Sequence, residues 1–244
     1  MAGLVHGKVA VITGATGGIG SAIARSLSAA GYSLVLNAPS NEKLHSLAAQ
    51  LGSPCVAVAG NLRVESIPQT LLSAALHNFG QCDVCFNNGG LLEAGNIETV
   101  DVERICNMVR VNVEGAFRMA YTFLQHFVQQ GHGHLVNTSS ILGQKVRPTV
   151  GAYAATKFAV EALSEALRME LGRTGVRISC VEPGLVRTGN ADRWENPVTE
   201  LKGAAAPSEP EDIARMVLQI LEQPIRQRAP QRVVHAVEPV LAAQ

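Results

Sequence analysis

The chain has 244 residues, 20 basic and 20 acidic side chains, 47% hydrophobic residues and only 16% charged residues. This length is enough for a large hydrophobic core without disulfides or a metal, and the composition excludes a disordered chain. A formal net charge of zero and a pI near 7.1 argue against binding to nucleic acid or to a membrane surface.

The chain shows no candidate signal peptide or membrane span. Its first apolar run, Val9 to Ile12, is too short for either. No later run approaches the ~18 apolar residues of a spanning helix. We therefore expect a cytoplasmic protein with no membrane partner.

Short continuous apolar runs alternate with amphipathic stretches along the chain. Such runs are typical of strands buried on both faces, and strands separated by helices predict right-handed βαβ units. The expected fold class is α/β: a single-domain Rossmann-type doubly wound fold, with a seven-stranded parallel sheet and helices on both faces. The predicted strands are Val9–Thr13, Ser33–Ala38, Cys55–Ala59, Val84–Asn87, His134–Thr138, Val176–Val181 and Arg232–Val237. The predicted helices include Ile19–Ala30, Glu42–Leu51, Glu103–Gln129 and Tyr153–Leu171.

The first predicted strand runs directly into a glycine-rich turn and then into a helix. The turn reads Thr13-Gly14-Ala15-Thr16-Gly17-Gly18-Ile19-Gly20. Glycines at 14, 18 and 20 permit a tight turn and close helix–strand packing, and the free N–H groups at the helix start favour a pyrophosphate. Because the turn follows the first strand of a βαβ repeat, it predicts a dinucleotide site.

The second predicted strand bears on which dinucleotide is bound. It ends Asn37-Ala38-Pro39-Ser40-Asn41, without the acidic residue that binds the ribose 2′-hydroxyl of NAD. Nothing in this stretch repels a 2′-phosphate, and Ser40 or Asn41 can donate to one. No arginine or lysine stands there or in the glycine turn. We favour NADP(H) over NAD(H) as the cofactor.

A candidate catalytic set lies further along the chain. Tyr153 and Lys157 are four residues apart on a predicted helix, so they share one face, and a nearby ammonium lowers a tyrosine pKa from about 10 towards neutrality. Such a pair also occurs by chance, so two further residues matter. Ser140 follows the fifth strand, where ligands bind to such sheets, and can donate to a carbonyl oxygen. Asn112 stands in an otherwise apolar helix, and its amide either bonds locally or holds a water that links Lys157 to solvent.

These residues occur in an order that is typical of one family. The chain contains T-G-x-x-x-G-I-G, Asn87-Asn88-Gly89-Gly90, Asn112, Ser140, Y-x-x-x-K at 153–157, and Pro183-Gly184 with Thr188. It resembles the short-chain dehydrogenases/reductases over nearly its whole length. The resemblance implies hydride transfer between NAD or NADP and a small molecule, with interconversion of an alcohol and a ketone or aldehyde.

The resemblance also implies roles for individual residues. Tyr153 would be the acid/base, Ser140 the donor to the substrate oxygen, Lys157 a contact of the nicotinamide ribose, and Asn112 the holder of the proton-relay water. The implied cofactor contacts are Gly14, Thr16, Gly17, Gly18, Ile19, Gly20, Ala38, Asn61, Leu62, Asn88, Gly89, Gly90, Val111, Tyr153, Lys157, Pro183, Gly184, Val186 and Thr188. One domain would cover residues 1–244, with a cofactor half of about 1–130, a catalytic and substrate-binding half of about 131–244, and a substrate loop of about 189–207.

Three positions depart from the family pattern. Gly89 replaces the usual alanine of the Asn-Asn-Ala-Gly turn and adds backbone freedom there. Asn61 replaces the usual aspartate beside adenine. Ala38 and Pro39 carry neither the acidic nor the basic residue that discriminates between cofactors. The four expected catalytic residues are unaffected.

Cysteine and histidine pairs suggest neither redox chemistry nor a metal. Cys82 and Cys85 form a C-x-x-C, but a redox pair needs a helix N-terminus, and the strand-like run Asp83 to Phe86 points the two thiols to opposite faces. We expect buried structural thiols. His132 and His134 lack a third ligand nearby, so we expect no metal site.

The substrate and the assembly state are less constrained. The stretch from Pro210 lacks the Thr-Gly turn of 3-oxoacyl-carrier-protein reductases and is similar to small NADP-dependent reductases and 3-hydroxy-acid dehydrogenases. Trp194 is either a lid over an apolar substrate or a packing residue. The pocket should be lined by Leu91, Leu92, Gln144, Lys145, Val146 and Gly189–Pro207, including Asp192 and Arg193.

Two long predicted helices carry apolar residues on more than one face, which predicts a homodimer or homotetramer. The alternative to an enzyme is a catalytically silent NAD(P)-sensing regulatory or scaffold protein on the same fold.

Overall fold

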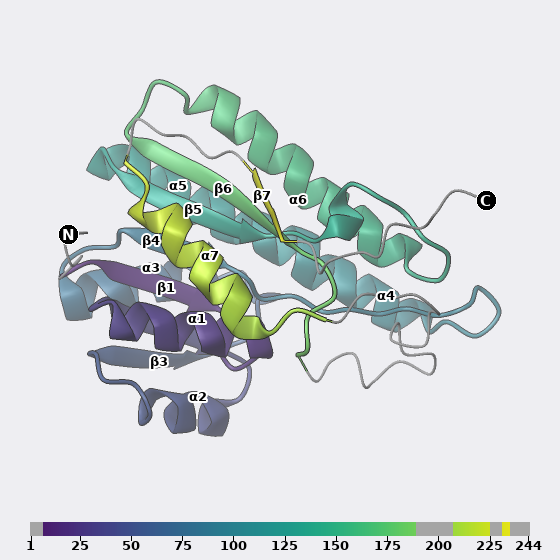
Figure 1. The fold of residues 1–244 in the computed structure, drawn as a ribbon, viewed down its shortest axis with the longest axis horizontal. Helices are drawn as coiled ribbons and strands as arrows, with labels where there is room; N and C mark the ends of the chain where they lie inside the picture. Colours follow the sequence, from purple (N-terminus) through teal and green to yellow (C-terminus); the bar gives the residue numbers. More distant parts are fainter. Residues whose placement is uncertain (1–6, 189–206, 225–230, 235–244) are drawn as a thin grey trace.

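The sheet of the computed structural model has the strand order β3-β2-β1-β4-β5-β6-β7, and every neighbouring pair is parallel (Figure 1). The structure describes residues 7–188, 207–224 and 231–234. The strands are β1 (Val9–Thr13), β2 (Ser33–Ala38), β3 (Cys55–Ala59), β4 (Val84–Asn87), β5 (Gly133–Thr138), β6 (Val176–Pro183) and β7 (Gln231–Val234). The predicted single-domain, doubly wound α/β fold is confirmed.

Eight or more residues form each of the α-helices between these strands, and two short helical segments accompany them. The α-helices are α1 (Gly18–Ala29), α2 (Asn41–Ala48), α3 (Ile67–Phe79), α4 (Val102–Val109), α5 (Ala116–Gln130), α6 (Gly151–Glu170) and α7 (Pro210–Glu222). The short segments are the π-helical η1 (Arg110–Gly115) and the 3-10 helix η2 (Ile141–Gly143). In the described ranges, no helix combines the length and apolarity that crossing a membrane requires.

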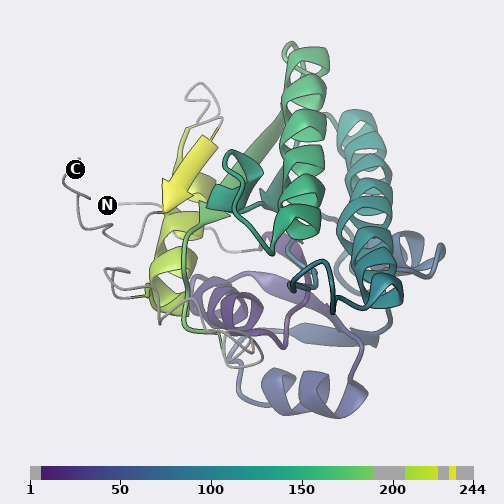
Figure 2. The same cartoon turned by 90° about the vertical axis from the view of Figure 1, so that its right-hand side faces the viewer.

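Each face of the sheet has its own hydrophobic cluster. One cluster contains Phe86 and joins the strands to α1, α2 and α7, and Figure 1 shows α7 beside α1. The other contains Phe123 and Phe127 and joins the opposite face to α3, α5 and α6, of which α5 and α6 stand side by side in Figure 2. Strands that are buried from both sides explain the continuous apolar runs in the sequence.

The ends of several helices follow from single residues. Ser40 caps α2 by accepting a hydrogen bond from Lys43 N, and Asp101 caps α4 in the same way. Gly80 and Gly131 end α3 and α5 in the left-handed region, with φ of 77° and 81°, which glycine adopts without steric cost. These caps determine where the helices begin or end, and therefore where the chain turns towards the neighbouring strand.

The predicted continuous helix Glu103–Gln129 is wrong in one respect. The structure divides this stretch into α4, η1 and α5, because six residues from Arg110 form a π-helical turn. A Cβ added to Gly115, at the end of this turn, would lie 2.8 Å from Leu62 O. The turn therefore brings the helix backbone against the loop after β3, and π turns of this kind often mark functional sites.

Other boundaries differ by one or two residues. β6 continues to Pro183 rather than ending at Val181, and β5 begins at Gly133. The last strand is Gln231–Val234, and residues 235–237 of the predicted strand lie outside the described residues. The structure also contains the helices α3 and α7, which were not among the helices named from the sequence pattern.

Candidate functional site

The candidate site lies at the carboxyl ends of the central strands. The strand order reverses between β1 and β4, and ligands bind to doubly wound sheets at such a switch point. Thr13 ends β1, Thr138 ends β5 and Pro183 ends β6 at this edge. The predicted cofactor and catalytic residues of the described part follow these strand ends or lie on helices next to them.

The glycine turn after β1 leaves the start of α1 open. Gly14 has a φ of 63°, and a Cβ added to Gly20 would lie 2.2 Å from Gly14 O, so both positions need glycine. No side chain caps the N-terminus of α1 at Gly17, and its first turn has no acidic residue. The first N–H groups of α1 therefore have no side-chain acceptor, which fits the phosphates of a dinucleotide. Thr16, Gly18 and Ile19 line the same opening, half-buried.

Thr13 and Asn88 join the glycine turn to β4. The Thr13 hydroxyl accepts hydrogen bonds from Asn88 N and Gly89 N, each at 2.9 Å. The Asn88 amide donates back to Thr13 O at 3.1 Å, and its oxygen accepts from the Thr138 hydroxyl at 3.2 Å. This network holds the ends of β1, β4 and β5 in one arrangement.

The expected adenine side of the site is closely packed. Leu62 and Val111 are buried, and a Cβ added to Gly89 would lie 2.6 Å from Leu62 Cδ1. The Asn61 side chain accepts from Arg63 N at 3.0 Å, so it holds its own loop. Ala38 is buried at the end of β2. The residues predicted around adenine are therefore brought to the same edge, with Leu62 against the turn that contains Gly89.

Ser140 and Tyr153 meet through their side chains. The Ser140 hydroxyl lies in a buried residue, accepts from Leu142 N at 3.2 Å, and forms a hydrogen bond with Tyr153 that lowers the tyrosine pKa. Burial has the larger, opposite effect and raises the pKa of Tyr153 to about 12. The pKa of Tyr153 thus lies above its usual value rather than below it as the sequence predicts, and Ser140 is the contact that lowers it.

Lys157 is buried behind the tyrosine. Its Nζ donates to Thr138 O at 2.8 Å and lies 5.6 Å from the centre of the Tyr153 ring. Burial lowers the pKa of Lys157 to about 8, against the raising effects of Cys180 and Glu161. The spacing of four residues on α6 thus places both side chains on one face, as the sequence predicts.

Asn112 lies in the π turn, and its side chain bonds to neighbouring residues of the protein. Its amide nitrogen donates to Leu91 O at 2.8 Å and to Thr156 Oγ1 at 3.2 Å, while its oxygen accepts from Leu91 N. An amide nitrogen has two hydrogens, so neither remains for a water. The predicted relay water at Asn112 stays a prediction, because among the described residues the amide oxygen accepts only from Leu91 N and has a second lone pair. The residue also ties the turn that contains Leu91 to α6.

The segment after β6 reaches both parts of the site. Pro183 O faces the Ser140 hydroxyl at 3.5 Å, and a Cβ added to Gly18 would lie 3.0 Å from Thr188. Gly184 is half-buried and Val186 is buried. Gly90 lies near Asn112, since an added Cβ would be 3.2 Å from Asn112 Oδ1. The predicted nicotinamide segment thus connects Ser140, the predicted donor to the substrate oxygen, with the glycine turn.

Several residues at this edge have roles that the motifs did not suggest. Thr138 and Thr156 link the expected catalytic residues to one another, and Glu182 accepts a hydrogen bond from Gln144 at 2.6 Å. Glu182 is completely buried, and burial together with the charge of Glu161 raises its pKa to about 7. The sequence feature that could have pointed to Glu182 is a charged residue inside a strand that is otherwise apolar, directly before Pro183.

Parts of the expected substrate pocket lie outside the described residues. The residues of the predicted pocket that the structure does not describe are 189–206, which include Asp192, Arg193 and Trp194. Leu91, Gln144, Lys145 and Val146 are exposed near the site, and Leu92 is half-buried.

The cysteine and histidine pairs lie elsewhere. Cys82 and Cys85 are free, buried thiols with raised pKa values, as expected of structural thiols. Both belong to one core cluster, so the expectation that they point to opposite faces is wrong, because Cys82 precedes β4. Among the described residues, no group of three or more histidine, cysteine, aspartate or glutamate side chains is arranged to hold a metal ion.

Comparison with known proteins identifies the family. The family described as short chain dehydrogenase matches residues 8–198. An uncharacterized oxidoreductase of Staphylococcus epidermidis is 35% identical over 222 residues, which cover 90% of this chain and 93% of the relative.

Two solved structures show the same architecture. An alcohol dehydrogenase from the archaeon Thermococcus sibiricus, complexed with 5-hydroxy-NADP, is 29% identical with a TM-score of 0.83, covering 97% of this chain and 99% of that one. A 3-ketoacyl-(acyl-carrier-protein) reductase from Brucella melitensis, complexed with NADH, is 26% identical with a TM-score of 0.86, covering 96% and 98%. Sequence motifs, fold and relatives agree, and the chain belongs to the short-chain dehydrogenase family of oxidoreductases.

Proposed function

We propose that this oxidoreductase interconverts an alcohol with a ketone or aldehyde, using NADP(H) in preference to NAD(H). It would act as a carbonyl reductase or as a secondary-alcohol or 3-hydroxy-acid dehydrogenase. The observation that carries the proposal is the gathering of Ser140, Tyr153 and Lys157 at the carboxyl edge, with the buried Lys157 ammonium 5.6 Å from the centre of the Tyr153 ring.

Each catalytic side chain has a task in this proposal. A bound nicotinamide supplies or accepts the hydride. Ser140 donates to the substrate oxygen and polarises the carbonyl, while Tyr153 exchanges a proton with the same oxygen. The Lys157 ammonium stabilises the phenolate that remains when Tyr153 has given up its proton. Asn112 positions α6 through Thr156, and a relay water would have to bind to a group other than its amide nitrogen.

The preference for NADP(H) rests on the end of β2. Ala38 and Pro39 offer no carboxylate, so nothing there repels a 2′-phosphate. Ser40 Oγ accepts from Lys43 N at 3.3 Å, which leaves its hydroxyl hydrogen free to donate. Lys43 is exposed on the first turn of α2 and adds positive charge on this side.

The proposal extends to domain use and assembly. Residues of about 1–130 would bind the cofactor, and those of about 131–244 would supply catalysis and substrate contacts, including a loop of about 189–207. Apolar side chains are exposed on α4, α5 and α6, which favours a homodimer or homotetramer through these helices. They include Val109, Val128, Phe158 and Met169. A cytoplasmic location is part of the same proposal.

The test begins with cofactor binding. Purified full-length protein is titrated with NADPH and with NADH while cofactor fluorescence is followed, and the preferred cofactor is then used in turnover assays with a panel of ketones, aldehydes and 3-oxo acids. We expect tighter binding of NADPH and turnover with at least one carbonyl compound. Binding of NADPH without turnover of any compound would favour the sensing or scaffold alternative. Failure to bind either cofactor would refute the proposal entirely.

A further inference from the structure

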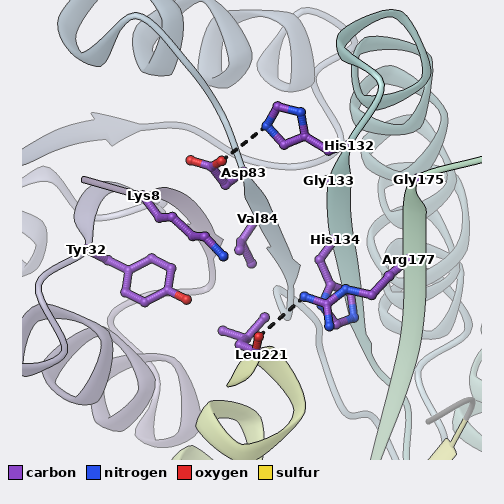
Figure 3. Close-up of a pocket in the computed structure, with 10 residues that line it drawn as sticks. All are labelled: Lys8, Tyr32, Asp83, Val84, His132, Gly133, His134, Gly175, Arg177 and Leu221. Atoms are coloured by element: carbon purple, nitrogen blue, oxygen red, sulfur yellow. Dashed lines mark hydrogen bonds and ion pairs between the residues drawn. The ribbon is translucent and has the colours of Figure 1, made fainter. Parts of the chain in front are cut away.

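A polar cavity lies at the edge of the sheet opposite the proposed catalytic edge. Its volume is about 80 Å³, and it is lined where β1, β4, β5 and β6 begin, together with the end of α7 (Figure 3). The proposed catalytic edge is formed by the carboxyl ends of the same strands. A cavity of this size holds several waters or one small ion. Its main polar side chains come from Lys8, Tyr32, Asp83, His132, His134 and Arg177.

Unused hydrogen-bond donors converge on this cavity. Figure 3 shows the Tyr32 hydroxyl and the Lys8 ammonium directed into the space between the strands and α7. Tyr32 is only 2% exposed, and neither its hydroxyl nor the Lys8 ammonium has a hydrogen-bond partner in the described part of the chain. Both groups line the cavity, so they are available to donate to a ligand that accepts hydrogen bonds.

Arg177 adds positive charge to the cavity, and His134 lies beside it. The Arg177 guanidinium donates to Gln223 O at 2.9 Å and to Leu221 O at 3.3 Å, which uses two of its five N–H groups. His134 is 2% exposed, and its Nδ1 has no partner among the described residues. Burial first, and then the charges of Arg177 and Lys8, lower the pKa of His134, which shows that both cations act on this wall.

The acidic groups near the cavity do not use up these donors. Asp83 accepts from Val9 N at 2.8 Å and Gln81 Nε2 at 3.2 Å, and it faces His132 Nε2 at 3.5 Å. Oδ2 is thus occupied by two donors, and Oδ1 has the contact with His132. Asp83, which lines the cavity, and Glu222, which does not, both raise the pKa of Tyr32, whereas Arg177 lowers it. The lining that remains is rich in donors and poor in available acceptors.

We propose that this cavity is a binding site for a small oxyanion, with Tyr32, Lys8 and Arg177 as its donors. The ligand class is inorganic phosphate or a short carboxylate, since both offer several acceptor oxygens in a small volume. The site is separate from the proposed cofactor site and does not depend on the proposed reaction. A bound anion stabilises the folded chain, because it binds the folded state only.

The test uses two probes and a matched set of variants. Inorganic phosphate and acetate are each titrated into the full chain by calorimetry, and the thermal unfolding midpoint is recorded with and without each anion. The variants are Tyr32→Phe, which removes only a hydroxyl, Lys8→Gln, and the control Tyr121→Phe on the exposed face of α5. Lys8→Gln keeps the proposal testable if Tyr32→Phe folds poorly.

We expect at least one anion to bind the wild type and the Tyr121→Phe control equally, and to raise the unfolding midpoint of both. Tyr32→Phe and Lys8→Gln should each weaken this binding about tenfold, the loss expected for one hydrogen bond to a charged ligand. The probe with the higher affinity identifies whether phosphate or carboxylate is preferred. Equal affinity in all four proteins would place the anion elsewhere, for example at the glycine turn, and would overturn the proposal. Absence of binding to the wild type would overturn it as well.

Discussion

Lys157 donates from Nζ to the carbonyl oxygen of Thr138 at 2.8 Å. The hydroxyl of the same threonine donates to Asn88, whose amide in turn donates to Thr13 O. A side chain of α6 is therefore connected to the glycine turn after β1 through the ends of β5 and β4. Because the connection uses buried or half-buried groups, it fixes the distance between the proposed catalytic pair and the proposed phosphate site.

The first prediction concerns the proposed acid/base. Tyr153→Phe removes one hydroxyl and keeps the ring, so the fold and the affinity for NADPH should stay unchanged. Turnover should fall by about 10²–10⁴-fold, because the substrate oxygen loses its proton donor. The measurement is steady-state turnover with the best substrate of the panel, beside fluorescence titration of NADPH.

Tyr121→Phe is the matched control for this substitution, since Tyr121 is exposed on α5. It should retain full turnover. Wild-type turnover in Tyr153→Phe would show that this tyrosine is not the proton donor.

The second prediction concerns the hydroxyl of Thr13, which accepts from Asn88 N and Gly89 N. Thr13→Val keeps the shape but leaves both N–H groups without this acceptor, and should lower the free energy of unfolding by about 2–4 kcal/mol. Thr13→Ser retains the hydroxyl and should lose less than about 1 kcal/mol. The measurement is urea unfolding of the wild type, Thr13→Val and Thr13→Ser. Equal stability of the valine and serine variants would mean that the two hydrogen bonds to the Thr13 hydroxyl contribute little.

The third prediction separates two glycines. An alanine at 20 would place its Cβ 2.2 Å from the backbone oxygen of Gly14, which cannot move without opening the turn. Gly20→Ala should therefore cost about 2 kcal/mol or more and abolish NADPH binding. The measurements are urea unfolding and fluorescence titration.

Gly89→Ala is the comparison. Its Cβ would meet the flexible end of Leu62 at 2.6 Å, Thr13 Oγ1 at 3.3 Å, and the backbone nitrogen of Gly14 at 3.4 Å, which is an ordinary contact distance. We expect a loss of less than about 1 kcal/mol and retained NADPH binding, because the leucine tip can rotate away. Similar losses in both variants would contradict this reading of the two positions.

The fourth prediction concerns pH and the buried Glu182. Burial and Glu161 raise its pKa from 4.5 to about 7, against the lowering effects of Gln144 and Arg168. The folded state therefore holds a proton that the unfolded state releases near pH 4.5. The contribution of this group to stability is present at low pH and is lost as the pH rises through about 7.

Glu182→Gln keeps an oxygen that can accept from Gln144 and removes the titration. Relative to the wild type, its free energy of unfolding should increase by about 2–3 kcal/mol between about pH 5 and about pH 8.5. Glu98→Gln is the control, because Glu98 is exposed, and should show no such change. A difference between wild type and Glu182→Gln that is constant with pH would show that Glu182 does not titrate in this range.

The sequence alone predicts most of the fold and the composition of the site. Continuous apolar runs identified the strands within one or two residues at each described boundary, because burial on both faces leaves a local signal. The spacing of Tyr153 and Lys157 also predicted that they share one face of α6, since helical periodicity is a local property. The glycine turn could also be predicted, because its pattern lies within a few consecutive residues.

What the sequence could not show depends on neighbours that are distant along the chain. The π turn at Arg110–Gly115 packs Gly115 against Leu62, and no local sequence pattern contains this contact. Similarly, the hydrogens of the Asn112 amide are used by Leu91 and Thr156, and only the folded chain brings these groups together.

The sequence by itself determined the α/β class, the family and the residue types available at the carboxyl edge, because these depend on periodicity and motif order. The tertiary structure alone decided the pKa directions of Tyr153 and Glu182 and the cavity beside Tyr32. Desolvation, and the cost of a buried group without a partner, depend on everything packed around that group, and residues from several strands contribute to it.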